Sequence, residues 1–80
     1  MYTVYILKCR DGSLYTGITT DLDRRLKKHA AGQASKYTRG KLPVRLVYSE
    51  KQPDESSAKK REYAIKRLER QEKEALIQQR

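Results

Sequence analysis

The N-terminal part of the chain is rich in β-branched and aromatic residues. Residues 2–9 (YTVYILKC) and 13–18 (SLYTGI) have the composition of strands, and the Arg-Asp-Gly-Ser sequence at 10–13 is typical of a hairpin turn. Gly17, inside the second segment, indicates either a bulge or a group that approaches the backbone closely. The chain is therefore predicted to begin with a β-hairpin.

The length of the hairpin loop decides which side chains share a face of the sheet. A two-residue loop would put Tyr5 and Tyr15 on opposite faces, whereas a three-residue loop over 10–12, with Gly12 in the left-handed region, would put them on one face. We favour the three-residue loop because it gathers a cleaner apolar layer on the other face: Val4, Ile6, Leu14, Thr16 and Ile18. The opposite face would then carry Thr3, Tyr5, Tyr15 and Gly17.

A polar segment with helical periodicity follows the hairpin. Leu22, Leu26 and Ala30 recur one turn apart, which predicts a buried stripe on a helix over residues 22–32. Gly32 at the end of this segment is typical of the residue that stops a helix.

The second half of the chain predicts one more strand and further helix. Residues 33–41 are expected to form a polar, basic loop, and residues 42–50 (LPVRLVYSE) form a strand with Pro43 near its start. From about Ser56 onward the pattern is helical, with a break near 68–70 that divides it into two helices. The predicted order is β-β-α-β-α(-α).

Composition and charge limit the class of protein. The 80 residues are expected to form one domain, 1–80, and 19 Lys+Arg against 10 Asp+Glu give a net charge of +9. This surplus attracts polyanions, of which nucleic acid is the commonest, although basic solubility alone is the alternative. One cysteine fits a reducing compartment, and no apolar run approaches the ~20 residues of a membrane span, so we expect a soluble cytoplasmic protein.

Three polar side chains on the predicted helices are candidates for chemistry. Arg25 and His29 lie one turn apart beside the apolar stripe, where they form either a solvated edge or part of a site. Glu62 falls within about 40° of Ala58 on the inward arc of the later helix. Because an unpaired charge is costly there, Glu62 either pairs with a cation such as Arg25 or holds a divalent metal.

Taken in order, these residues resemble the GIY-YIG nuclease domain family, in its short stand-alone bacterial form. Thr3-Val4-Tyr5 stands where the family has G-I-Y, and Tyr15-Thr16-Gly17 stands where it has Y-I-G. Arg25 and His29 match the family's arginine and histidine, and Glu62 matches its glutamate. The similarity extends over nearly the whole chain and includes Ser-Lys-Tyr-Thr at 35–38.

The resemblance implies a fold and an activity. The fold is α+β, a small three-stranded antiparallel sheet flanked by helices. The activity is hydrolysis of phosphodiester bonds in nucleic acid, with Mg²⁺ or Mn²⁺ as the cofactor and DNA as the expected partner. The implied catalytic residues are Tyr5, Tyr15, Arg25, His29 and Glu62. The basic loop is expected to supply the contacts to nucleic acid: Lys36, Tyr37, Arg39 and Lys41.

The implied roles agree with the chemistry that phosphodiester hydrolysis needs. A tyrosine phenol helps to activate the attacking water, Arg25 stabilises charge on the phosphoryl group, and Glu62 holds the metal. We expect Arg25 and the metal to lower the phenol pKa of the tyrosines, which would let a phenol act as a base.

Two hypotheses about function follow. The first is an endonuclease, acting in DNA repair or recombination. The second is a module that binds nucleic acid with weak or absent catalysis, because many family members carry an asparagine in the last helical region, where this chain has Lys73 and Glu74. A core-facing carboxylate at Glu62 favours the enzyme, since binding alone requires only cations.

Overall fold

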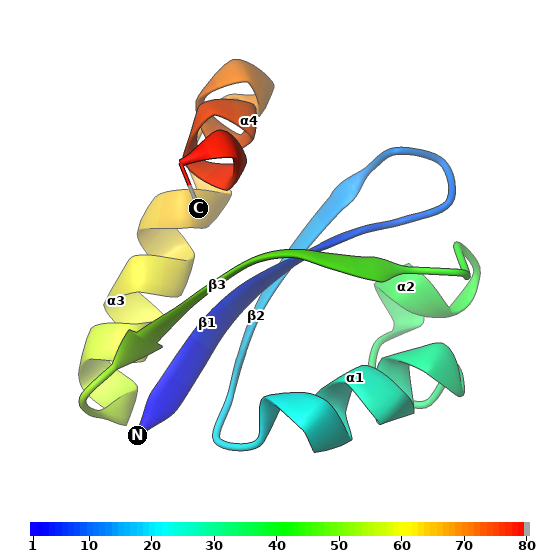
Figure 1. Cartoon of the computed structure of the whole chain (residues 1–80), viewed down its shortest axis with the longest axis horizontal. Coiled ribbons are helices and arrows are strands. Elements are labelled where there is room, and N and C mark those ends of the chain that lie inside the picture. Colours follow the sequence, from blue (N-terminus) through cyan, green and yellow to red (C-terminus); the bar gives the residue numbers. More distant parts are fainter. Residues whose placement is uncertain (80) are drawn as a thin grey trace.

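The computed structural model describes residues 1–79, and the order of its elements matches the predicted order with one addition (Figure 1). The elements are β1 (Tyr2–Lys8), β2 (Leu14–Thr19), α1 (Leu22–Ala30), α2 (Lys36–Arg39), β3 (Arg45–Gln52), α3 (Glu55–Lys66) and α4 (Arg70–Gln78). The break between α3 and α4 lies where the sequence predicts it. Within the described residues, no helix has the length and apolar character needed to cross a membrane.

The three strands form one antiparallel sheet in the order β2-β1-β3, which confirms the predicted sheet. β1 therefore lies at the centre and β2 at an edge. The register between β1 and β3 shifts between Ile6 and Leu7, whereas the pairing of β1 with β2 is regular.

The hairpin has the three-residue loop. Leu7 pairs with Tyr15 and Tyr5 pairs with Gly17. The amide of Cys9 donates to the carbonyl of Ser13 at 2.8 Å, which closes the loop. Gly12 has a φ of 88°, in the left-handed region that a side chain disfavours. The predicted register is therefore confirmed, and Tyr5 and Tyr15 share a face.

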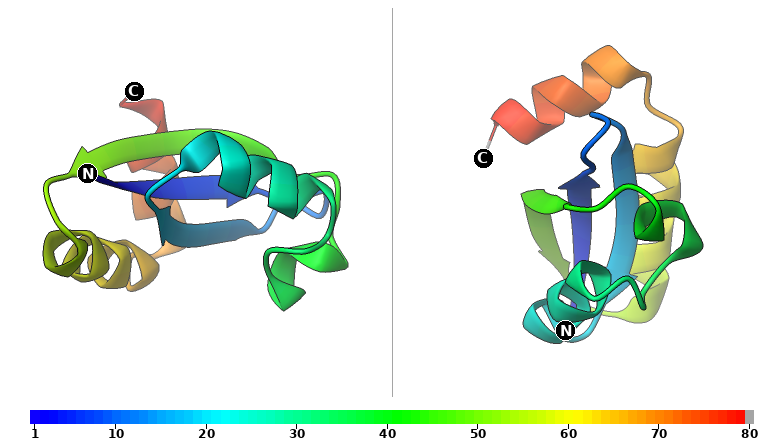
Figure 2. Two further views of the ribbon diagram at one scale, coloured as in Figure 1. Left: turned by 90° about the horizontal axis from the view of Figure 1, so that it is seen from below. Right: turned by 90° about the vertical axis from the view of Figure 1, so that its right-hand side faces the viewer.

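The helices cover the two faces of the sheet. Successive side chains of a strand point to opposite faces, so the apolar face carries Val4 and Ile6, which pack against Ala58 and Ile65 of α3. The partly buried residues around this core are Tyr2, Leu14, Ile18, Val47, Tyr48, Leu76 and Ile77. α1 and α2 lie on the other side of the strands, in front of them in the right-hand view of Figure 2, with α3 behind.

The prediction for the first helix is wrong in one respect. Ala30 is exposed, and His29 is the residue of α1 that is fully buried. Leu22 and Leu26 are partly buried, and with His29 they form a spacing of i, i+4, i+7 that is as regular as the predicted stripe. Consequently His29 is not part of a solvated edge.

Two segments differ from the predicted boundaries. The basic loop contains the short helix α2, because the Ser35 side chain accepts a hydrogen bond from the amide of Tyr37 and caps it. The third strand begins at Arg45 rather than at residue 42, so Pro43 lies before it, where its missing N–H removes no ladder bond.

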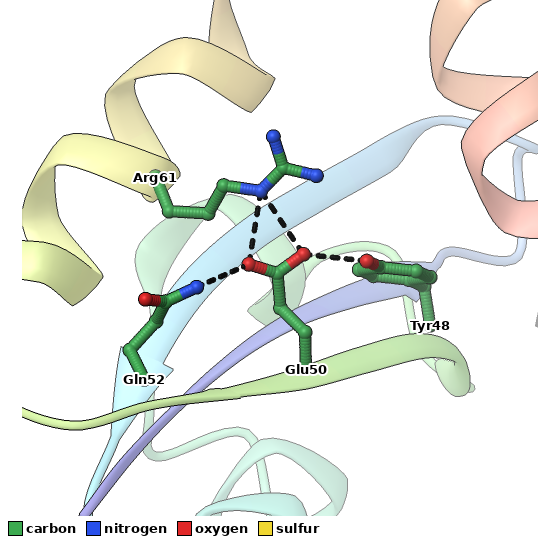
Figure 3. Close-up of polar contacts among 4 residues, drawn as sticks. All are labelled: Tyr48, Glu50, Gln52 and Arg61. Atoms are coloured by element: carbon green, nitrogen blue, oxygen red, sulfur yellow. Dashed lines mark hydrogen bonds and ion pairs between the residues drawn. The ribbon is translucent and has the colours of Figure 1, made fainter.

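A polar network ties β3 to α3 (Figure 3). Tyr48, Glu50 and Gln52 alternate along β3 and face Arg61 of α3. Glu50 accepts hydrogen bonds from the hydroxyl of Tyr48, from Gln52 Nε2 at 2.7 Å, and from Arg61 Nε at 3.0 and 2.9 Å. Burial acts to raise the pKa of Glu50, but these donors together hold it below its ordinary value. The carboxylate is therefore well satisfied although it is largely buried.

This network predicts the effect of removing its cation. Arg61→Ala should lower the free energy of unfolding by about 1–3 kcal/mol, because it leaves the Glu50 charge with fewer donors. Arg67→Ala is the control, since Arg67 is exposed and its guanidinium lies beside Tyr63, 3.5 Å from the hydroxyl and 5.4 Å from the ring centre, and not in the Glu50 network. Urea denaturation measures both. Equal losses for the two variants would contradict the importance of the network.

Candidate active site

Gly17 lies at the centre of the candidate site, where its lack of a side chain makes room for a neighbouring ring. A Cβ built at Gly17 would lie 2.7 Å from the Tyr5 hydroxyl and 2.8 Å from its Cζ, closer than real contacts allow. It would also lie 3.2 Å from a ring carbon of Tyr15. The sequence left two explanations for Gly17, a bulge or a close approach to the backbone. The structure shows the close approach, and the group that approaches is the ring of Tyr5 on the neighbouring strand.

Three aromatic rings meet on this face. The ring centres of Tyr5 and Tyr15 are 6.4 Å apart, and that of His29 lies 5.8 Å from Tyr5 and 5.3 Å from Tyr15, edge to face in both cases. Tyr5 and His29 are each 1% exposed, whereas Tyr15 is partly exposed. A buried phenol and imidazole thus lie behind a second phenol that solvent can reach.

A chain of hydrogen bonds passes through the imidazole. The Tyr5 hydroxyl lies 3.0 Å from His29 Nε2, and His29 Nδ1 lies 3.1 Å from Thr38 Oγ1. Thr38, on α2, is fully buried. Sequence reasoning missed Thr38 as a partner of the histidine; the one signal for it is the Ser-Lys-Tyr-Thr similarity at 35–38.

The pKa of the Tyr5 phenol reflects both its burial and the charged groups near it. Burial raises the pKa of the Tyr5 phenol most strongly, the charges of Tyr15 and Glu62 add to this, and Arg25 acts to lower it. Arg25 and Glu62 therefore both lie within electrostatic reach of the phenol. The expectation of a lowered phenol pKa is wrong for Tyr5 in the protein without metal, because burial outweighs the guanidinium.

His29 is shifted in the direction that keeps it neutral. Burial lowers the pKa of its imidazole, and the positive charge of Arg25 lowers it further. A histidine with a pKa below its ordinary value is uncharged at neutral pH, so one ring nitrogen has a free lone pair. The imidazole can therefore accept a proton.

Glu62 lies on α3, which covers the opposite face of the sheet and packs against the edge strand β2. The side chain of Glu62 is 22% exposed, and its carboxylate lies 3.2 Å from Lys66 Nζ. The cation paired with Glu62 is thus Lys66, one turn along the same helix, and not Arg25, which was the example given for the ion-pair alternative.

The donors present are compatible with a weakly held Mg²⁺ or Mn²⁺. Among residues 1–79, no group of three or more His, Cys, Asp or Glu side chains is arranged to hold a metal ion. Mg²⁺ is commonly bound by one or two carboxylates, with water and substrate phosphate completing the shell. Glu62 fits that pattern as a single carboxylate with exposed surface.

The basic segment lies next to the site. Tyr37 stacks on Tyr15 with ring centres 6.0 Å apart, and Lys41 Nζ lies 3.8 Å from the centre of the Tyr37 ring. Lys36 and Arg39 are exposed on α2. A pocket of about 280 Å³ beside them is lined by Leu14, Tyr15, Thr16, Tyr37, Lys66 and Lys73. Lys66 and Lys73 are cations of this surface that sequence reasoning did not assign to it.

Comparison with known proteins places this arrangement in a family. The GIY-YIG catalytic domain profile matches residues 1–75. The UPF0213 protein BH0048 of Halalkalibacterium halodurans is 55% identical over 74 residues, which cover 92% of this chain and 79% of that protein. The UPF0213 protein VNG_2274C of Halobacterium salinarum is 51% identical over 77 residues, which cover 96% of this chain and 100% of that protein.

Two solved structures are similar over nearly the whole chain. The solution NMR structure of the UPF0213 protein BH0048 from Bacillus halodurans has a TM-score of 0.65 at 52% identity, covering 100% of this chain and 86% of that one. The solution NMR structure of the protein EF2693 from E. faecalis has a TM-score of 0.67 at 41% identity, covering 98% and 83%.

The fold and the aromatic site define a nuclease-like α+β domain, and the chain belongs to the GIY-YIG family. The relatives that carry the UPF0213 name are themselves short bacterial and archaeal proteins. The family named from the sequence motifs is thereby confirmed. The names of these relatives state no activity.

Gly17 provides a test of how the site is assembled. Gly17→Ala should lower the free energy of unfolding by about 1–3 kcal/mol and displace the Tyr5 ring, because the new methyl group overlaps it. Near-ultraviolet circular dichroism of the tyrosines and urea denaturation measure the two effects. Gly40→Ala is the control: a Cβ there meets nothing within 4 Å, and Gly40 has a φ of −87°. A Gly17→Ala variant with native spectrum and stability would disprove the close approach.

Proposed function

We propose that the protein is a metal-dependent endonuclease that hydrolyses phosphodiester bonds in DNA. The observation that carries this proposal is a buried phenol, Tyr5, hydrogen-bonded to a neutral imidazole, His29, with Arg25 and Glu62 in electrostatic reach. The membership of the GIY-YIG family supports action on nucleic acid. A setting in DNA repair or recombination rests on the family resemblance alone.

The raised pKa of Tyr5 makes the phenolate an unfavourable resting form, so the base must work in another way. The Tyr5 hydroxyl donates to His29 Nε2 in the tautomer that leaves that nitrogen unprotonated. When bound substrate brings the attacking water against the phenol oxygen, that oxygen takes a proton from the water while its own proton passes to His29 Nε2, and the phenolate is never formed as a stable species. Tyr15, partly exposed beside them, lies on the side from which substrate arrives.

Arg25 and Glu62 complete the proposed set. The Arg25 guanidinium stabilises the negative charge that develops on the phosphoryl oxygens. Glu62 would hold the Mg²⁺ or Mn²⁺ ion, which when bound supplies Lewis-acid polarisation of the phosphoryl group. The Glu62–Lys66 pair does not prevent this, because Lys66 is more than half exposed and such a pair is worth about 0–1 kcal/mol.

The second candidate function is a DNA-binding module without useful catalysis. Lys66 already neutralises Glu62, and Lys73 lines the pocket at the region where many family members have asparagine. Both features favour phosphate binding over metal binding. The two candidates share the nucleic-acid surface and differ in what Glu62 does, so a variant of Glu62 separates them.

Glu62→Gln is the decisive variant. It should reduce Mg²⁺- or Mn²⁺-dependent cleavage by at least about 100-fold, because it removes the metal-binding charge. DNA binding should be kept or improved, since one negative charge is gone. Cleavage of single-stranded, duplex and branched DNA, and of RNA, is measured with the metal and with a chelator. Arg25→Ala should also abolish cleavage, and a higher metal concentration should not restore it.

Glu55→Gln is the matched control for this experiment. Glu55 lies on the same helix, and its carboxylate also pairs with a lysine one turn away, Lys59, at 3.4 Å. This variant has the same change of charge but leaves the site intact, so it should cleave at the wild-type rate. Equal cleavage by wild type and Glu62→Gln would exclude the metal assignment, and no cleavage by wild type under any condition would favour the binding module.

Binding itself should depend steeply on salt. With a net charge of +9, neutralisation of several phosphates predicts that the logarithm of the affinity falls linearly with the logarithm of salt concentration. Replacing Lys36, Arg39 and Lys41 together by Gln should reduce this slope by up to about 3 on duplex DNA. The control triple variant removes the same charge from three exposed lysines elsewhere: Lys51, Lys59 and Lys60. An equal loss of slope in the control would mean that overall charge, not this segment, binds DNA.

A further inference from the structure

The chain of hydrogen bonds at His29 continues beyond the imidazole. Thr38 Oγ1, 3.1 Å from His29 Nδ1, also lies 3.4 Å from the backbone carbonyl oxygen of Ser35. Tyr5, His29 and Thr38 are at most 1% exposed. Solvent therefore cannot complete their hydrogen bonds, and each proton in the chain needs an acceptor among these groups.

Three protons must be placed: one on the Tyr5 hydroxyl, one on the neutral imidazole of His29, and one on the Thr38 hydroxyl. If the imidazole proton is on Nδ1, Tyr5 donates to Nε2, Nδ1 donates to Thr38, and the Thr38 hydroxyl donates to the Ser35 carbonyl. All three protons then have acceptors.

The other tautomer leaves one proton without an acceptor. If the imidazole proton is on Nε2, it must be donated to the Tyr5 oxygen, and the Thr38 hydroxyl turns to donate to Nδ1. The proton of Tyr5 then finds no acceptor among the described residues, since the hydrogen bond of its hydroxyl is the one with His29. A buried donor left unsatisfied in this way is unfavourable, because it loses its hydrogen bond to water and gains none in the protein.

We infer that Thr38 is a positioning residue, which holds His29 in the Nδ1–H tautomer and so presents an unprotonated Nε2 to Tyr5. Thr38 is fully buried against the imidazole and acts through it. The consequence for catalysis rests on the proposed function, because only an unprotonated Nε2 can take the phenol proton; the tautomer itself does not depend on it.

The short helix α2 explains how Thr38 reaches the imidazole. Ser35 caps α2 through its side chain, and its carbonyl oxygen accepts the amide of Arg39 at 3.0 Å in addition to facing the Thr38 hydroxyl. This single turn places Thr38 inward, against His29, while Lys36 and Arg39 remain exposed. The same turn thus serves both the nucleic-acid surface and the tautomer of the histidine.

The tautomer can be measured directly because His29 is the only histidine of the chain. Long-range ¹H–¹⁵N correlation spectra of the wild-type protein at mildly alkaline pH should show Nδ1 protonated and Nε2 unprotonated. Thr38→Val, which keeps the shape of the side chain but lacks the hydroxyl, should lose the dominance of the Nδ1–H tautomer. Thr38→Ser keeps the hydroxyl and should retain the wild-type spectrum.

Activity provides the second measurement. Thr38→Val should reduce the single-turnover rate of cleavage by about 10-fold or more with DNA affinity unchanged, and Thr38→Ser should restore most of the rate. A purely packing role would be satisfied by Val and not by Ser, so the opposite ranking would overturn the inference.

The two proposals fail in distinguishable ways. An Nε2–H tautomer in the wild-type spectrum overturns the role of Thr38 whether or not the protein is a nuclease. An Nδ1–H tautomer that Thr38→Val disrupts supports the role of Thr38 even where no DNA is cleaved, in which case the endonuclease proposal alone is lost. Should Thr38→Val fail to fold, the wild-type and Thr38→Ser spectra decide the question.

Discussion

The approach of the Tyr5 ring to the backbone of Gly17 is the contact on which the rest of the structure depends. It requires the two residues to be direct partners across β1 and β2, and that register follows from the three-residue loop with Gly12 in the left-handed region. A slip of one residue would exchange the two faces of the strand. The phenols would then point toward α3, and the apolar residues would face α1. One backbone register thus decides both where the core forms and where the aromatic site lies.

Burying Tyr5 creates a requirement that the neighbouring elements meet in turn. A phenol hydroxyl removed from water needs a partner, and His29 of α1 provides it. The buried imidazole then needs a partner for its other nitrogen, which Thr38 of α2 provides. Each buried polar group therefore requires the next one as its hydrogen-bond partner. These hydrogen bonds therefore join β1 to the two consecutive helices α1 and α2, and they end at the backbone carbonyl of Ser35.

The sequence was sufficient for features that depend on local periodicity. The register of the hairpin followed from the apolar layer of alternate residues. Thr38 could not be found in this way, since its partner His29 lies nine residues away and only the capped turn of α2 brings them together. The burial of His29 was missed because a stripe through Ala30 fits the same helix equally well.

The sequence also could not predict the balance between burial and nearby charges that sets the pKa of a buried group. Arg25 does act to lower the pKa of the Tyr5 phenol, as expected, but burial raises this pKa by more. The size of the burial effect depends on how completely the folded protein covers the ring. The partner of Glu62 was likewise not found from sequence, which left a cation such as Arg25 or a metal as alternatives and placed Lys66 further round the helix. Such outcomes depend on distances in the folded protein, which periodicity does not supply.

Glu50 faces α3 and Glu62 projects from it. The two carboxylates differ in how many of their lone pairs are used by hydrogen bonds within the protein. The side chains of Glu50 and Glu62 are similarly covered, at 17% and 22% exposed. Glu50 accepts four hydrogen bonds from three side chains, so its lone pairs are occupied and a metal would have to break the whole network. Glu62 is held by one ion pair with a lysine that is more than half exposed. A pair of that kind contributes at most about 1 kcal/mol, so it leaves the oxygen lone pairs of Glu62 more accessible to a ligand than those of Glu50. Of these two carboxylates, Glu62 is therefore the one that fits the metal-binding role proposed above.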